Sequence, residues 1–81
     1  MAVRLTAEEQ NADVVVRKGR GDYRIFPISD AALRWLKGHS PDARWNVMDG
    51  QPAITASRAE TARLSDEVRG NDFRVCGRLP G

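Results

Sequence analysis

This chain has little of what most catalytic and metal sites need. Its 81 residues include one histidine, His39, and one cysteine, Cys76. A structural zinc site takes four Cys or His ligands, and an internal disulfide takes two cysteines, so both are excluded within a single chain. The acidic residues are scattered without the spacing of a calcium loop, and no glycine-rich phosphate loop occurs. We therefore expect no metal, no cofactor and no catalytic residues, and predict that the protein is not an enzyme.

The two residues that could support an enzyme have simpler explanations. His39 follows a predicted helix, where an imidazole complements the negative end of the helix dipole. Cys76 has an alternating position in a predicted strand, where cysteine is usually a small buried hydrophobe. A His39–Cys76 dyad is the alternative, and it requires the imidazole and the thiol to meet in one cleft.

Long apolar runs and a strong charge excess are also missing. No run approaches the roughly 18 residues of a membrane span, and the first residues, Met1 to Thr6, lack the apolar core of a secretory signal. We expect a cytoplasmic protein that does not contact a membrane. Thirteen basic residues face 11 acidic ones, a formal net charge of +2, and all the basic residues except Lys18 and Lys37 are arginine. So small a net charge does not select a class of partner.

What the chain does contain is a repeated order of elements. Residues 14–28 are typical of a two-stranded hairpin and residues 29–38 of a capped helix. Residues 44–55 and 57–69 repeat this order, and residues 72–78 resemble a last strand. We predict one α+β domain over residues 13–79, in the order ββαββαβ: a mostly antiparallel sheet of four or five strands with two helices on one face. Residues 1–12 form either a short helix, since Thr6 and Glu9 fit a capping box, or a frayed segment.

The second hairpin has the clearest turn. Asp49-Gly50 is a two-residue turn signal, and the turn predicts two opposed pairs, Trp45 with Ile54 and Val47 with Pro52. Pro52 lacks an amide hydrogen, so its strand is either an edge strand or one that starts late. As an edge, residues 52–55 could pair with a second copy of the chain or be covered by the N-terminal segment.

Caps and apolar stripes define the two predicted helices. Ser29 and Ser57 are suitable N-caps, and Gly70 with Asn71 fits a left-handed C-cap. The residues expected to face the core are Ala32, Leu33, Trp35 and Leu36 in the first helix, Thr61, Leu64 and Val68 in the second, and Phe73, Val75 and Leu79 in the last strand. Trp35 and Trp45 are expected in the core, with exposure at a protein contact as the alternative.

Basic residues gather at the tip of the first hairpin. The candidate binding surface consists of Arg17, Lys18, Arg20 and Arg24, which Arg74 and Arg78 extend if the last strand joins the same sheet. Such a ribbon could contact nucleic-acid phosphates. Against this use, Asp13, Asp22 and Asp72 weaken the positive field, and exposed aromatic residues for base stacking are not expected.

Three segments give the chain a resemblance to known proteins. Residues 27–36, residues 42–45 and residues 72–75 look like small uncharacterised proteins of proteobacterial genomes, often found near plasmid or phage material. The resemblance covers about two thirds of the chain and carries over no catalytic residues. It implies a bacterial or mobile-element accessory protein, and compact proteins of that origin often bind and block a host machine, as anti-CRISPR proteins do.

Together these features favour a non-catalytic binding module. The expected partner is another protein, contacted through an exposed sheet edge and the arginine-bearing hairpin tip, with an accessory or inhibitory role. The alternative is a small nucleic-acid-binding domain in which Arg17, Lys18, Arg20 and Arg24 contact phosphates. The expected oligomeric state is a monomer or an edge-strand homodimer.

Overall fold

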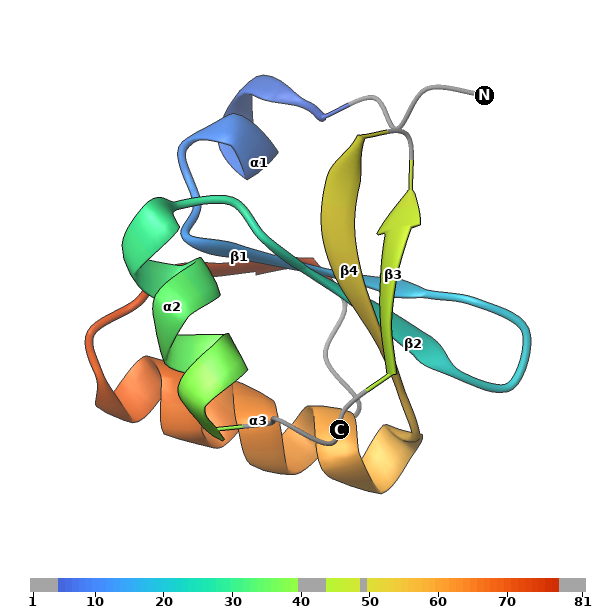
Figure 1. Cartoon of the computed structure of the whole chain (residues 1–81). Helices are drawn as coiled ribbons and strands as arrows, with labels where there is room; N and C mark the ends of the chain where they lie inside the picture. Colours follow the sequence, from blue (N-terminus) through green and yellow to red (C-terminus); the bar gives the residue numbers. More distant parts are fainter. Residues whose placement is uncertain (1–4, 40–43, 49, 78–81) are drawn as a thin grey trace.

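The computed structural model describes residues 5–39, 44–48 and 50–77 of the chain. Three helices and five strands follow one another along these residues (Figure 1). The helices are α1 (Ala7–Gln10), α2 (Asp30–His39) and α3 (Arg58–Gly70), and the strands are β1 (Val14–Lys18), β2 (Tyr23–Pro27), β3 (Arg44–Met48), β4 (Gln51–Ala56) and β5 (Val75–Gly77). The predicted α+β class is confirmed, with one short helix ahead of the predicted order.

All five strands belong to one sheet, in the spatial order β3-β4-β2-β1-β5. The neighbours are antiparallel except β1 and β5, which are parallel. The chain leaves β4 and reaches β5 through α3, which carries it across one face of the sheet (Figure 1). Among the described strands, β3 and β5 are therefore the two edges.

Both longer helices cover the same face of this sheet. Ala32 and Leu36 of α2 and Leu64 and Val68 of α3 are buried there. They contact strand residues that alternate in sequence, namely Val14, Val16, Tyr23, Ile25, Ile54 and Ala56. Burial of a large aliphatic side chain contributes about 1.5–3 kcal/mol, so this cluster is the main core.

The opposite face carries a smaller apolar cluster next to α1. Val15, Phe26 and Ala53 are buried in it together with Ala12. Helix α1 begins with the expected capping box: the hydroxyl of Thr6 accepts from the amide of Glu9 at 3.2 Å, and Glu9 Oε1 accepts from the amide of Thr6 at 2.9 Å. Of the two readings of the N-terminal segment, the short helix is thus the one observed over residues 7–10.

The position of β4 corrects one prediction. The predicted pairs Trp45–Ile54 and Val47–Pro52 are confirmed, but β4 lies between β3 and β2 and is not an edge. Its pairing with β2 extends only from Ala56 to Ile54. Pro52 lies beyond the end of that ladder, where its missing amide hydrogen removes no bond to β2. The prediction that residues 52–55 form an edge strand, which could pair with a second copy of the chain, is therefore wrong.

The end of α3 corrects a second prediction. Gly70 and Asn71 are not left-handed; the left-handed residue is Asp72, with a φ of 64°. The amide of Phe73 donates to the carbonyl of Val68 at 3.2 Å, and the amide of Asp72 donates to the carbonyl of Arg69 at 3.1 Å. These two bonds form a Schellman motif. It turns the chain so that Phe73 packs against the cluster that contains Val68.

Candidate functional site

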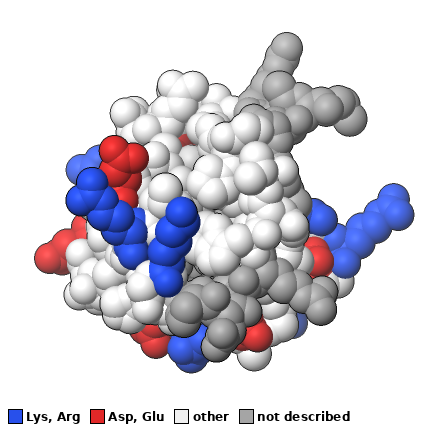
Figure 2. Space-filling model, in the orientation of Figure 1, with Lys and Arg blue, Asp and Glu red and all other residues white. Residues whose placement is uncertain are grey.

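The tip of the first hairpin presents fewer available cations than its sequence suggests. The β1–β2 register places Arg17 opposite Arg24 and Lys18 opposite Tyr23. Residues directly opposite one another share a face of the sheet, so Arg17 and Arg24 are neighbours on the face away from α2 and α3. Lys18 and Arg20 are exposed, and Figure 2 shows basic side chains extending at the right, where the hairpin lies in Figure 1.

Arg17 is engaged within the molecule. Its guanidinium donates from Nε and Nη2 to both carboxylate oxygens of Glu9, at 3.0–3.2 Å, and its charged carbon lies 5.8 Å from the centre of the Phe26 ring. Glu9 is buried, with 8% of its surface exposed. The pKa of Glu9 is lowered, mainly by the hydrogen bond from Arg17 and then by that from the Thr6 amide. This pair tethers α1 to the sheet and neutralises the Arg17 charge.

Arg24 is likewise close to an acidic group. Its Nη1 and the Oδ1 of Asp22 each lie 2.5 Å from the point where a Cβ on Gly19 would stand. Arg24 Nε and Asp22 Oδ1 are buried and make no hydrogen bond to described residues. The carboxylate of Asp22 thus lies near the Arg24 guanidinium, with no ion pair between them among the described contacts. The exposed cations of the tip are Lys18 and Arg20.

Arg74 lies far from this tip, at the other end of β1. Its amide donates to Asp13 Oδ2 at 2.9 Å, and its carbonyl accepts from the amides of Asp13 and Val14. Strand β5 does join the sheet, beside β1, but the parallel register matches Val75 to Val14, which places Arg74 before the start of β1. Arg78 falls outside the described residues. The five described members of the predicted basic surface are thus divided between two ends of the sheet.

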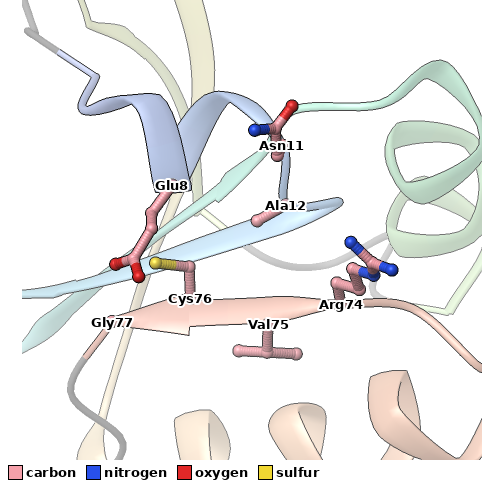
Figure 3. Close-up of a pocket in the computed structure, with 7 residues that line it drawn as sticks. All are labelled: Glu8, Asn11, Ala12, Arg74, Val75, Cys76 and Gly77. Carbon is pink, nitrogen blue, oxygen red and sulfur yellow. The ribbon is translucent and has the colours of Figure 1, made fainter.

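A shallow groove lies between α1 and β5. It has a volume of about 490 Å³, and the side chains of Glu8, Asn11, Arg74 and Cys76 surround it (Figure 3). The Cys76 thiol lies near the Glu8 carboxylate in this view. The groove is open and mixed in charge, and the described residues that line it include neither a histidine nor a second thiol.

His39 and Cys76 lie on opposite faces of the sheet. The His39 ring stacks on Trp35, with ring centres 4.1 Å apart, and Trp35 packs against the main core under α2 and α3. Cys76 packs against the smaller cluster on the other face. The dyad weighed from the sequence is therefore not assembled. Within the described part of the chain, no three His, Cys, Asp or Glu side chains form a group that could hold a metal.

The feature that the sequence interpretation missed is the outer edge of β3. Trp45 and Val47 share the face that α2 and α3 cover, because alternate residues of a strand point the same way. Trp45 is half-buried beside the core, with Lys37 Nζ 6.0 Å from its ring centre. Val47 is 75% exposed, the one strongly exposed large hydrophobic side chain among the described residues. Its place three residues before the turn residue Gly50, at the far end of the hairpin, is the signal that could have indicated this exposure.

Both tryptophans lie between the two expected positions, burial in the core and exposure at a protein contact. Trp35 and Trp45 are half-buried and pack against the main core. Each ring also keeps part of its surface accessible beside a polar side chain, His39 or Lys37.

The comparisons with known proteins identify no relative. No family model matches the chain, and neither a curated protein nor a solved structure shows significant similarity to it. Among the described residues, no helix has the length and apolar character that crossing a membrane requires.

Proposed function

We propose that the protein is a non-catalytic binding module for another protein, and that the partner adds an extended strand along the outer edge of β3. The observation that carries this proposal is the 75% exposure of Val47 on an edge strand. In strand addition, main-chain hydrogen bonds supply affinity, and alternate side chains supply specificity. The half-buried indole of Trp45, two residues away on the same face, gives the incoming strand an apolar surface to cover.

The same geometry makes nucleic acid the weaker candidate. Phosphate binding depends on several cations that are free to displace counterions. Glu9 holds Arg17, and Asp22 lies beside Arg24, so the hairpin tip offers chiefly Lys18 and Arg20. Two exposed cations support a low affinity that falls with added salt.

An accessory or inhibitory role is part of this proposal. The resemblance to small proteins of plasmid and phage origin supports it, since such proteins act by occupying a surface of a host protein. A strand added along β3 would occupy a partner's own sheet edge or an extended segment, and a blocked edge is a sufficient mechanism of inhibition.

Affinity capture with matched variants tests the proposal. Tagged wild-type protein, Val47→Lys and Arg20→Ala would be expressed in cells of the source organism, and the captured proteins would be compared. Val47 and Arg20 are both exposed, so neither change should unfold the domain. We expect a partner that is retained by Arg20→Ala and lost by Val47→Lys. Capture lost by Arg20→Ala alone, or a mobility shift of DNA or RNA that requires Lys18 and Arg20, would reject it.

A further inference from the structure

The two edges of the sheet are protected very differently. The β5 edge is three residues long and ends at Gly77, which has a φ of 117°. A Cβ at Gly77 would overlap the carbonyl oxygen of Val16, and α1 lies beside this strand across the groove of Figure 3. A short strand that ends in an irregular backbone gives little length for pairing with another chain.

The β3 edge has none of these protections along its described side chains. It is five residues long, and it pairs with β4 alone among the described strands. Its one charged residue is Arg44, at the start of the strand; Trp45, Asn46 and Val47 carry no charge, and the strand contains neither proline nor glycine. Soluble proteins usually block a free edge with charge, proline or a bulge, because an unblocked edge pairs with other strands. Around Val47, the described part of this edge therefore has little of the usual protection.

One register brings the apolar side chains of two β3 strands together. If two copies pair antiparallel about a twofold axis at Asn46, all five residues of each strand are matched: Arg44 with Met48, Trp45 with Val47, and Asn46 with itself. Shifting the centre to Trp45 or Val47 leaves part of each strand unmatched. In the centred register, each exposed Val47 lies against the indole of the other copy, a favourable aromatic and β-branched cross-strand pair.

We propose that the strand added to β3 is the β3 strand of a second copy of this chain. The result is a symmetric dimer with one continuous sheet that has β3 and its counterpart at the centre. Because the axis is perpendicular to the sheet, α2 and α3 of both copies lie on the same face. This inference rests on the proposed function, since it uses the same edge. A dimer occupies the β3 edges of both copies, so self-association would compete with the binding of a different protein there.

Molar mass measured by light scattering after size exclusion gives the first test. With rising protein concentration, the wild-type mass should increase from 9.0 kDa towards about 18 kDa, twice the mass of the chain. Val47→Lys removes the apolar contact and puts a charged side chain on each edge, the usual way in which strand pairing is blocked. Its mass should therefore stay at 9.0 kDa with an unchanged circular dichroism spectrum. Arg20→Ala should dimerise as the wild type does. A wild-type mass that stays at 9.0 kDa up to millimolar concentration would overturn the proposal.

Disulfide trapping tests the register. In a Cys76→Ser background, Asn46→Cys places two thiols opposite one another, with Cα atoms about 4.5–5.5 Å apart, within reach of a disulfide. Mild oxidation should convert most of this variant to a covalent dimer. The matched control is Arg20→Cys in the same background, an exposed turn position remote from β3, which should form far less. Equal trapping at both positions would overturn the twofold register.

The two proposals fail in distinguishable ways. If the wild-type chain is monomeric and Asn46→Cys is not trapped, but captured proteins still depend on Val47, the second copy is rejected and strand addition by another protein is retained. If neither self-association nor capture depends on Val47, both are rejected.

Discussion

The bond between Glu9 and Arg17 should stabilise the fold in a strongly pH-dependent way. Glu9 is 8% exposed, and its two carboxylate oxygens accept from Arg17 and from the amide of Thr6. Hydrogen bonds to charged groups contribute about 1.5–3 kcal/mol. The side chain of Arg17 is 36% exposed, and solvent weakens such a pair, so we expect Glu9→Gln to lower the free energy of unfolding by about 1–2 kcal/mol at neutral pH.

The direction of the pH dependence follows from the pKa. The folded-state pKa of Glu9 lies below its ordinary value of 4.5, chiefly because of the hydrogen bond from Arg17. A lowered pKa means that the stabilisation is complete above about pH 4.5 and is lost as the pH falls through the folded-state value. The difference between the wild type and Glu9→Gln should therefore shrink under acid conditions.

Urea unfolding at neutral pH and at about pH 3 measures both effects. For a domain of this size, 1 kcal/mol corresponds to a melting-temperature shift of about 4–8 °C, so thermal unfolding gives an independent check. A double-mutant cycle with Arg17→Gln isolates the pair, since Arg17 makes other contacts. Equal stability of Glu9→Gln and the wild type at neutral pH would refute the reasoning, as would a difference that stays constant in acid.

Three further substitutions test the fold by chemical or thermal unfolding. Asp72→Gly should stabilise by about 0.5–1 kcal/mol, because Asp72 is left-handed and its negative charge opposes the dipole at the end of α3; destabilisation would contradict the Schellman geometry. Gly77→Ala should destabilise the fold and speed hydrogen exchange of the β5 amides, because the new Cβ meets the Val16 carbonyl. Unaltered exchange in β5 would contradict the close approach of Gly77 to Val16. Leu36→Ala, at a position with 0% exposure, should cost about 2–5 kcal/mol, and a loss below 1 kcal/mol would place Leu36 outside the main core.

Much of the fold follows from short-range patterns. The Asp49-Gly50 sequence correctly predicted the Trp45–Ile54 pairing. Helical spacing correctly predicted that Ala32, Trp35 and Leu36 face the main core, whereas Leu33, also expected there, is half-buried outside both clusters. Turn geometry and helical periodicity are local, so a few neighbouring residues suffice to determine them.

The parts that sequence did not predict depend on contacts between distant segments. Proline chemistry allowed Pro52 to lie either on an edge strand or past the end of a ladder, and only the sheet order distinguishes the two. Asp72 adopts the left-handed conformation because Phe73 returns to the core beside Val68. The sequence prediction assigned this conformation to Gly70 and Asn71 because glycine adopts it most readily.

The candidate site was predicted only in part for the same reason. Arg17 was grouped with the hairpin cations, but the folding of α1 back over the sheet brings Glu9 to it. Val47 was paired correctly with Pro52, yet its exposure depends on which segments pack over that end of β3. Neither the Glu9–Arg17 contact nor the exposure of Val47 can be inferred from the spacing of residues along a strand.

Residue-resolved amide hydrogen exchange, recorded on dilute and on concentrated protein, tests most directly that β3 is the edge where another strand adds. We predict that some amides of Arg44–Met48 exchange rapidly in dilute protein and become protected at high concentration, while exchange in β5 stays the same. Val47→Lys should abolish this gain in protection. Protection that appears in β5 instead, or amides of β3 that are fully protected in the dilute monomer, would contradict the account.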